Sequence, residues 1–311
     1  MITIAELRQK WNDMPIFENG FVRINETHPL EVYIGHEELD QKTLMVVDTN
    51  KADELPSSRS IIAKNFQRAD GRWAISFRLI HQENEDVFIM LCWDMIEASR
   101  TSSNTALKQL LKRYKNWQKL LERQHSEVMD TVSQKGLLGE LLFLEEFINK
   151  ADCCKAIESW VGPDAADQDF IFDNTWAEIK SISVSAEAVS ISSLEQLACA
   201  EPGSLVVYYL EKTSSTNTSA FSLAGKINEI RTRLADCAEA REKFKLKLFQ
   251  YGYRDLKEYA QDYYCLRGKH IFNVMGDFPR LTKENVAKAV VSAKYAISLA
   301  AIASYEQVGE D

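Results

Sequence analysis

The feature that most constrains the fold is a pair of short alternating runs on either side of Asp173-Asn174. Asn and Asp tolerate the left-handed conformations that a two-residue hairpin turn requires. With these two residues as the loop, Asp169 lies opposite Glu178. Side chains alternate across a strand, so Asp169, Glu178 and Lys180 share one polar, solvent-facing side of the hairpin. The other side is apolar and carries Phe170, Phe172, Ala177 and Ile179.

The charged side of this hairpin needs a positive group, because two carboxylates ~5 Å apart across a ladder repel each other. Lys180 offsets part of the repulsion, and a divalent cation such as Mg²⁺ or Mn²⁺ offsets more. Metal-dependent phosphodiester hydrolysis needs such a set: the ion binds the scissile phosphate and the attacking water, and the lysine orients or deprotonates that water. The alternative is a half-exposed hairpin with a charged outer face, and the spacing alone fits both. A three-residue loop would move Asp169 to the opposite face from Glu178.

A helix predicted over residues 132–149 precedes the hairpin, and its stretch 137–147 is apolar nearly all round. Glu140 lies within that apolar stretch. A carboxylate there is costly to bury unless it is paired, hydrogen-bonded or bound to a metal. We therefore predict that Glu140 is a third acidic group pointing at the site, the alternative being a helix-end glutamate that reaches water.

The two ends of the chain show different patterns. Residues 1–100 are rich in short β runs, and the runs 73–80 and 87–93 predict a hairpin joined by residues 81–86. A helical period begins near residue 105 and continues to 124. The sequence thus predicts a β-rich N-terminal domain over 1–100 and a second domain over 101–311.

The helix predicted over 105–124 has one apolar face and one basic face. A solvated surface and a surface that contacts phosphates are both compatible with the basic face. That face carries Lys108, Lys112, Arg113, Lys115, Lys119 and Arg123.

Helices and strands alternate through the rest of the chain. Strands are predicted at 205–210 and 270–274, and helices at 224–249, 254–263 and 283–303. This alternation favours an α+β or α/β architecture.

The bulk composition restricts the class of protein. The 311 residues carry a net charge of −9, which argues against a simple DNA-coating protein but not against an enzyme that holds metal ions beside DNA. The six cysteines form no CxxC pair and lie near no histidine at zinc-ligand spacing. No window reaches the ~18 apolar residues of a membrane span, and no signal peptide is recognisable. We expect a cytoplasmic protein that does not bind membranes.

At this point the order of motifs resembles the PD-(D/E)XK nuclease superfamily. It consists of a helix with Gly139-Glu140, then Asp169-Phe-x-Phe172, then Trp176-x-Glu178-x-Lys180. More narrowly, it resembles the bacterial PD-(D/E)XK motif proteins that are encoded in restriction-like phage-defence clusters. The stretches 136–141, 191–197 and 278–281 strengthen the narrower match.

The resemblance implies a restriction-endonuclease-like mixed sheet flanked by helices, preceded by the N-terminal β-rich domain. It implies that Asp169, Glu178 and Glu140 bind Mg²⁺ or Mn²⁺ and that Lys180 is the catalytic lysine. Gln196 matches loosely a polar residue on a helix after the lysine strand of some members. The Pro-Asp pair of the superfamily name is present at Pro163-Asp164, but the hairpin register favours Asp169.

Two functions follow as expectations from this resemblance. The first is a metal-dependent DNA endonuclease of a bacterial restriction or phage-defence system, with DNA and other subunits of the system as partners. The second is a catalytically silent scaffold or binding subunit that assembles with an ATPase or helicase, because a fold does not fix a function. An intact Asp, Glu and Lys set favours the first.

Overall fold

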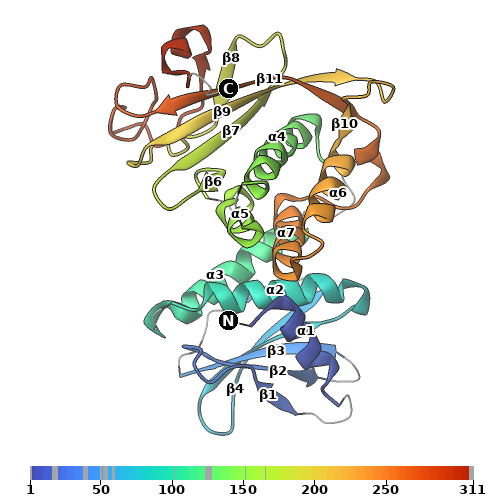
Figure 1. Ribbon diagram of the computed structural model, residues 1–311. Coiled ribbons are helices and arrows are strands. Elements are labelled where there is room, and N and C mark those ends of the chain that lie inside the picture. Colours follow the sequence, from blue (N-terminus) through green and yellow to red (C-terminus); the bar gives the residue numbers. More distant parts are fainter. Residues whose placement is uncertain are drawn as a thin grey trace. The chain divides into compact units, whose positions relative to one another are not determined.

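The computed structural model describes residues 2–15, 20–37, 41–49, 51, 55–57, 60–101, 103–122, 128–150, 152–164 and 166–307. The chain divides into two units, Met1–Ser126 and Glu127–Asp311, which Figure 1 colours from blue to teal and from green to red. Within the described residues, none of the helices combines the length and the apolar character needed to cross a membrane.

The first unit is built on a five-stranded antiparallel sheet in the order β1-β2-β3-β5-β4. Three helices, α1, α2 and α3, accompany it (Figure 1). The strands are β1 (Phe21–Arg23), β2 (Glu31–Glu37), β3 (Gln41–Asp48), β4 (Ile61–Gln67) and β5 (Trp73–Leu79), and the helices are α1 (Ile4–Asn12), α2 (Glu85–Ala98) and α3 (Ser103–Glu122).

The predicted hairpin between residues 73–80 and 87–93 is wrong in its second half. β5 is a strand, but a short 3-10 turn (η1, Gln82–Asn84) follows it and leads into α2. Nearly every residue of α2 between Phe88 and Ile96 is buried. A helix that is apolar all round has no visible 3.6-residue period, so such a run cannot be told from a buried strand by periodicity.

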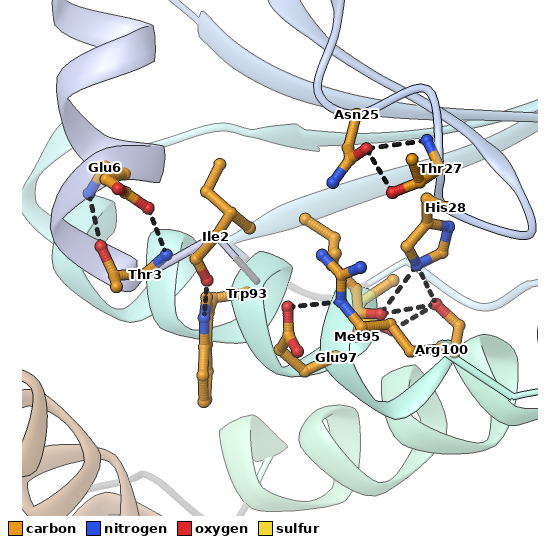
Figure 2. A network of polar contacts seen from close by, with 12 residues as sticks. Ile2, Thr3, Glu6, Asn25, Thr27, His28, Trp93, Met95, Glu97 and Arg100 are labelled. Atoms are coloured by element: carbon orange, nitrogen blue, oxygen red, sulfur yellow. Dashed lines mark hydrogen bonds and ion pairs between the residues drawn. The ribbon is translucent and has the colours of Figure 1, made fainter.

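Polar contacts attach the start of the chain and the loop before β2 to α2 (Figure 2). Thr3 and Glu6 form a capping box at the start of α1, which satisfies two otherwise unpaired backbone N–H groups. The Trp93 indole N–H donates to the Ile2 carbonyl at 2.8 Å. His28 Nε2 lies 3.0 Å from the Ile96 carbonyl oxygen. These contacts fix α2 against elements far from it in sequence.

Helix α3 packs on α2 within the first unit. The buried Asp94 carboxylate of α2 accepts hydrogen bonds from Arg113 (2.5 and 2.9 Å) and from the Trp117 indole (2.6 Å). Residues 101–311 were predicted to form the second domain, whereas α3 belongs to the first of the two units. Residues 123 and 124, the predicted end of this helix, lie outside the described residues.

The second unit contains a five-stranded mixed sheet in the order β10-β11-β9-β7-β6. β7 and β9 run parallel, and the other neighbouring pairs are antiparallel. The strands are β6 (Phe170–Ile171), β7 (Trp176–Ile182), β9 (Gly203–Thr213), β10 (Phe221–Ser222) and β11 (Tyr263–Val274). The predicted strands 205–210 and 270–274 lie within β9 and β11 and are confirmed.

The two faces of this sheet have different covers. Helices cover one face: α4 (Thr131–Ile148), α5 (Cys153–Ser159), α6 (Leu223–Arg233) and α7 (Ala238–Tyr251) contribute to one hydrophobic core with it (Figure 1). A second core lies on the other face, under the paired strands β8 (Ala188–Ile191) and β12 (Tyr295–Ser298) and the 3-10 helix η4 (Ala300–Tyr305).

Three predicted C-terminal helices differ from the structure. The span 224–249 forms two helices, α6 and α7, which lets both Ile230 and Phe244 reach one core. The span 254–263 holds only the short 3-10 helix η3 (Lys257–Ala260) and the start of β11. The span 283–303 contains β12 and part of η4, because Ile297 is buried by pairing with β8. Long-range strand pairing has overridden local helix propensity here.

Candidate functional site

The hairpin register is the one predicted from the alternating runs. Phe170 pairs with Ala177 and Ile171 with Trp176, and the Phe172 N–H donates to the Thr175 carbonyl at 2.8 Å. The loop therefore consists of two residues, which excludes the three-residue alternative that would have separated the carboxylates.

The two faces of β7 divide as the alternation predicts. Ala177 and Ile179 belong to the core under the helices, whereas Glu178 and Lys180 are aligned with Leu205 and Val207 of β9, which belong to the other core. The expectation of a solvent-facing lysine is wrong, because only 17% of the Lys180 side chain and 1% of the Glu178 side chain are exposed. This burial also contradicts the alternative interpretation, in which the charged face of the hairpin is half-exposed to solvent.

Hydrogen bonds and an ion pair connect the hairpin charges. Lys180 Nζ lies 2.6 Å from Glu178 Oε1. Asp169 Oδ2 accepts a hydrogen bond of 2.8 Å from the Ile179 backbone N–H, and the Asp169 carbonyl accepts from the N–H groups of Val161 and Gly162. Asp169 is thereby held from both sides at the beginning of β6.

Glu140 approaches this group from α4, and its side chain is buried with only 6% of the residue exposed. Trp160 donates its indole N–H to Glu140 Oε2 at 2.7 Å, and the Tyr251 hydroxyl donates to Oε1 at 2.8 Å. Gly139 allows the helix to approach the sheet, since a Cβ at this position would meet Ser181 Oγ at 2.1 Å.

The space beside Gly162, called the Gly162 cradle below, shows how close the carboxylates of Glu140 and Asp169 are. A Cβ at Gly162 would lie 3.0 Å from Asp169 Oδ1 and 3.1 Å from Glu140 Oε2. The two oxygens are therefore no more than about 6 Å apart, and any side chain at this position would intrude on both. The structure thus places Glu140 and Asp169 together at Gly162 and pairs Lys180 with Glu178. The charges of Glu178, Asp169 and Glu140 all raise the pKa of Lys180, so the four predicted side chains interact electrostatically.

The proton affinities reflect this crowding. Burial, followed by the charge of Asp169, raises the pKa of Glu178 to about 8. Burial and Asp169 raise the pKa of Glu140 well above its ordinary value, and burial raises that of Asp169. Burial by itself would lower the pKa of Lys180, but Glu178 and Asp169 raise it. Negative charge is in excess here, which is the condition that a cation relieves.

The donor set fits a divalent metal ion of the Mg²⁺ type. Glu178 Oε2 is buried and has no hydrogen-bond partner among the described residues, and such an oxygen is costly unless a ligand satisfies it. The described residues contain no group of three or more Asp, Glu, His or Cys side chains close enough together to hold a metal ion. Mg²⁺ does not require one, because one or two carboxylates plus water and substrate phosphate usually hold it.

The other acidic and polar candidates do not join the site. Asp164 forms an ion pair with Lys247 at 2.9 Å, and Asp167 is exposed. Gln196 lies in a turn rather than on a helix, where its side chain accepts from the Ser192 N–H at 2.7 Å.

Two residues that contact the site, Trp160 and Tyr251, were not predicted from the sequence. Both donate to Glu140, and Tyr251 is separated from it by 111 residues. No local sequence pattern predicts a contact between residues so far apart in the chain. The one available signal was the need of a buried glutamate for hydrogen-bond donors.

Comparison with known proteins gives one match. A family model described as "Putative PD-(D/E)XK family member, (DUF4420)" matches residues 7–300. No curated protein and no solved structure matches the chain. The match covers nearly the whole chain, including both units and all four charged residues of the site, and the chain therefore belongs to this PD-(D/E)XK family.

Proposed function

We propose that this protein is a metal-dependent DNA endonuclease of a bacterial restriction or phage-defence system, acting in the cytoplasm with Mg²⁺ or Mn²⁺. The observation that carries the proposal is the buried Glu178 oxygen without a partner among the described residues, beside Asp169 and Lys180. A purely structural hairpin gains nothing from a buried cluster of like charges, whereas a metal-binding hairpin requires one.

Each charged residue has a role in this proposal. Asp169 and Glu178 would hold the ion, with Glu140 as the third acid from α4. A bound Mg²⁺ would supply Lewis-acid stabilisation of the phosphate and lower the pKa of the attacking water. Lys180, held by Glu178, would orient that water or donate to a phosphate oxygen. The fixed hydrogen bonds to Asp169 and Glu140 keep both carboxylates in place before substrate binds.

The second unit, which carries the site, is acidic and is therefore expected to bind DNA weakly by itself. Affinity for DNA has to come from other residues or from partner subunits. Residues 127–311 carry 28 acidic and 20 basic side chains, whereas residues 1–126 carry 18 and 17. Helix α3 concentrates five of those basic residues and one acidic residue. Lys108, Lys112 and Lys115 are exposed and, at spacings of four and three, share one helical stripe. We propose that this stripe contacts phosphates and that partner subunits add to it.

Metal binding is the direct test of the site. Isothermal titration of the metal-free protein with Mn²⁺ should show millimolar or tighter binding that Asp169→Ala abolishes. Asp167→Ala is the matched control, because Asp167 is two residues away and exposed; it should bind as the wild type does. Equal binding by wild type and Asp169→Ala would place the ion elsewhere and remove the basis of the proposed function.

The α3 stripe predicts a change in salt dependence. Reversing Lys108, Lys112 and Lys115 to Glu should weaken binding to a DNA duplex of mixed sequence. It should also reduce the slope of log affinity against log salt by about 2 to 3, because each phosphate contact contributes ~0.9. Fluorescence anisotropy without Mg²⁺ measures both.

The matched control for the stripe reverses three exposed basic residues of the same unit, Lys10, Arg23 and Lys64. It changes the net charge by the same amount. An equal loss of affinity in both triple variants would mean that net charge alone matters and that α3 has no specific contact with DNA.

A further inference from the structure

Helix α7 presents one stripe of side chains to the surroundings of Glu140. Phe244, Lys247 and Tyr251 are spaced by three and four residues, so they lie on the same side of the helix. The Phe244 ring packs against Trp160 with centroids 5.9 Å apart. Lys247 donates to the Trp160 carbonyl and to Asp164. Tyr251 donates to Glu140 at 2.8 Å. One helix face therefore fixes Trp160 and reaches the acid.

The two donors occupy the two oxygens of one carboxylate. Trp160 binds Oε2 and Tyr251 binds Oε1, and the Trp160 and Tyr251 rings lie 6.5 Å apart. The Trp160 ring cannot follow Glu140 if the acid rotates, because Trp160 is fully buried and is held by Phe244 and Lys247. The carboxylate is thus confined in one orientation, with Oε2 facing the Gly162 cradle and Asp169.

The Gly-Leu-Leu-Gly-Glu stretch of α4 makes room for this arrangement. Gly136 lies one helical turn before Glu140, and a Cβ there would lie 3.2 Å from the Tyr251 hydroxyl oxygen. The position of Tyr251 is fixed from the other side as well, because α7 ends at this residue and Gly252 closes the helix with φ 102°. The hydroxyl therefore enters a space that α4 leaves open by lacking a side chain.

We propose that Tyr251 is a positioning residue for the metal site: its hydroxyl, together with the Trp160 indole, aims the Glu140 carboxylate at the ion. The inference rests on the proposed function, in which Glu140 is a metal ligand. Residues that hydrogen-bond to a ligating side chain fix its orientation, and their loss costs roughly 10- to 100-fold in metal affinity.

The test is Tyr251→Phe, which removes one hydroxyl and retains the ring. Isothermal titration with Mn²⁺ should show affinity weakened by roughly 10- to 100-fold. The titration is run well below the thermal unfolding midpoint of the metal-free variant, because Glu140 Oε1 also loses a hydrogen-bond donor in the metal-free protein. Tyr253→Phe is the matched control. Its hydroxyl donates to Asp255 at 3.1 Å, and it lies two residues from Tyr251, so it should bind metal as the wild type does.

A double-mutant cycle separates positioning from a general structural role. In a Glu140→Ala background, Tyr251→Phe should cause no further loss of affinity, because the group it orients is absent. A further loss in that background, or wild-type affinity in Tyr251→Phe alone, would overturn the inference. Failure of this inference and failure of the proposed function can be told apart: if Asp169→Ala also leaves binding unchanged, the metal site itself is wrong, whereas if only Tyr251→Phe leaves binding unchanged, the positioning role alone fails.

Discussion

Lys180→Ala is expected to lower DNA cleavage by about 10²- to 10⁴-fold, the range observed for the loss of a proton-transferring or charge-stabilising group. The lysine is largely buried beside Glu178, so nothing else in the hairpin replaces its ammonium group. The loss should remain in the rate measured at saturating Mg²⁺, where any weaker metal binding has been compensated.

The fold should survive this substitution at mildly acidic pH. Without Lys180 the buried Glu178 loses the ion pair that lowers its pKa, so it takes up a proton instead of remaining charged and unpaired. Lys180→Gln keeps more of the side-chain volume and serves as the second variant. Lys269→Ala is the matched control, since Lys269 is half-buried on β11 and pairs with Glu146 away from the hairpin; it should cleave normally.

The decisive comparison is made in cells that carry the whole gene cluster, scored by phage restriction, because partner subunits are then present. Lys180→Ala, Asp169→Ala and Glu178→Ala should all lose restriction. If all three restrict phage as well as the wild type does, the endonuclease proposal fails. The protein would then act as a scaffold for an ATPase or helicase partner.

The stability of the metal-free protein is expected to fall as the pH rises from about 4.5 to about 8. Glu178 has a pKa of about 8 in the folded protein against an ordinary value of 4.5, so over this range the folded chain retains a proton that the unfolded chain releases. Its stabilising contribution is complete below pH 4.5 and is lost as the pH rises through 8. At ~1.4 kcal/mol per pKa unit the effect amounts to a few kcal/mol.

Urea unfolding in EDTA at several pH values measures this slope. Glu178→Gln removes the titrating group and should flatten the slope and stabilise the chain at pH 8, while it abolishes metal binding. Glu187→Gln is the matched control, because Glu187 is exposed and should leave the slope unchanged. In the wild-type protein, saturating Mg²⁺ should recover at pH 8 the free energy of unfolding that is lost when Glu178 releases its proton, since the ion then neutralises the carboxylate. An unaltered slope in Glu178→Gln would contradict the assignment.

The site was more predictable than the fold around it because its information is local. A two-residue turn and a period of two determine the pairing of Phe170 with Ala177, and this register puts Glu178 and Lys180 on the face of β7 opposite to Ala177 and Ile179. Whether the charged face of the hairpin is buried or exposed to solvent was less predictable. β12 lies more than a hundred residues further along the chain, and it pairs with β8 over the sheet face that carries Lys180, which is largely buried rather than solvent-facing.

The failures have a common physical origin. The run 87–93 was predicted as a strand because burial on all sides of α2 erases its helical periodicity. The helix predicted over 283–303 is replaced in part by β12, which pairs with β8. Neither pattern reveals that Ile297 pairs with Val189. Tyr251 could not be predicted for the same reason: its contact with Glu140 forms only when α7 and α4, which are far apart in the sequence, have packed.

The distance in sequence between Glu140 and Tyr251 has a consequence for how the protein folds. Contacts that close long loops form late and slow folding, and the parallel pairing of β7 with β9 is itself non-local. The chain must therefore complete its topology before the carboxylates converge. An ion that binds only the converged set stabilises the native state more than the folding transition state, so it would lengthen the lifetime of the folded protein without hastening its formation.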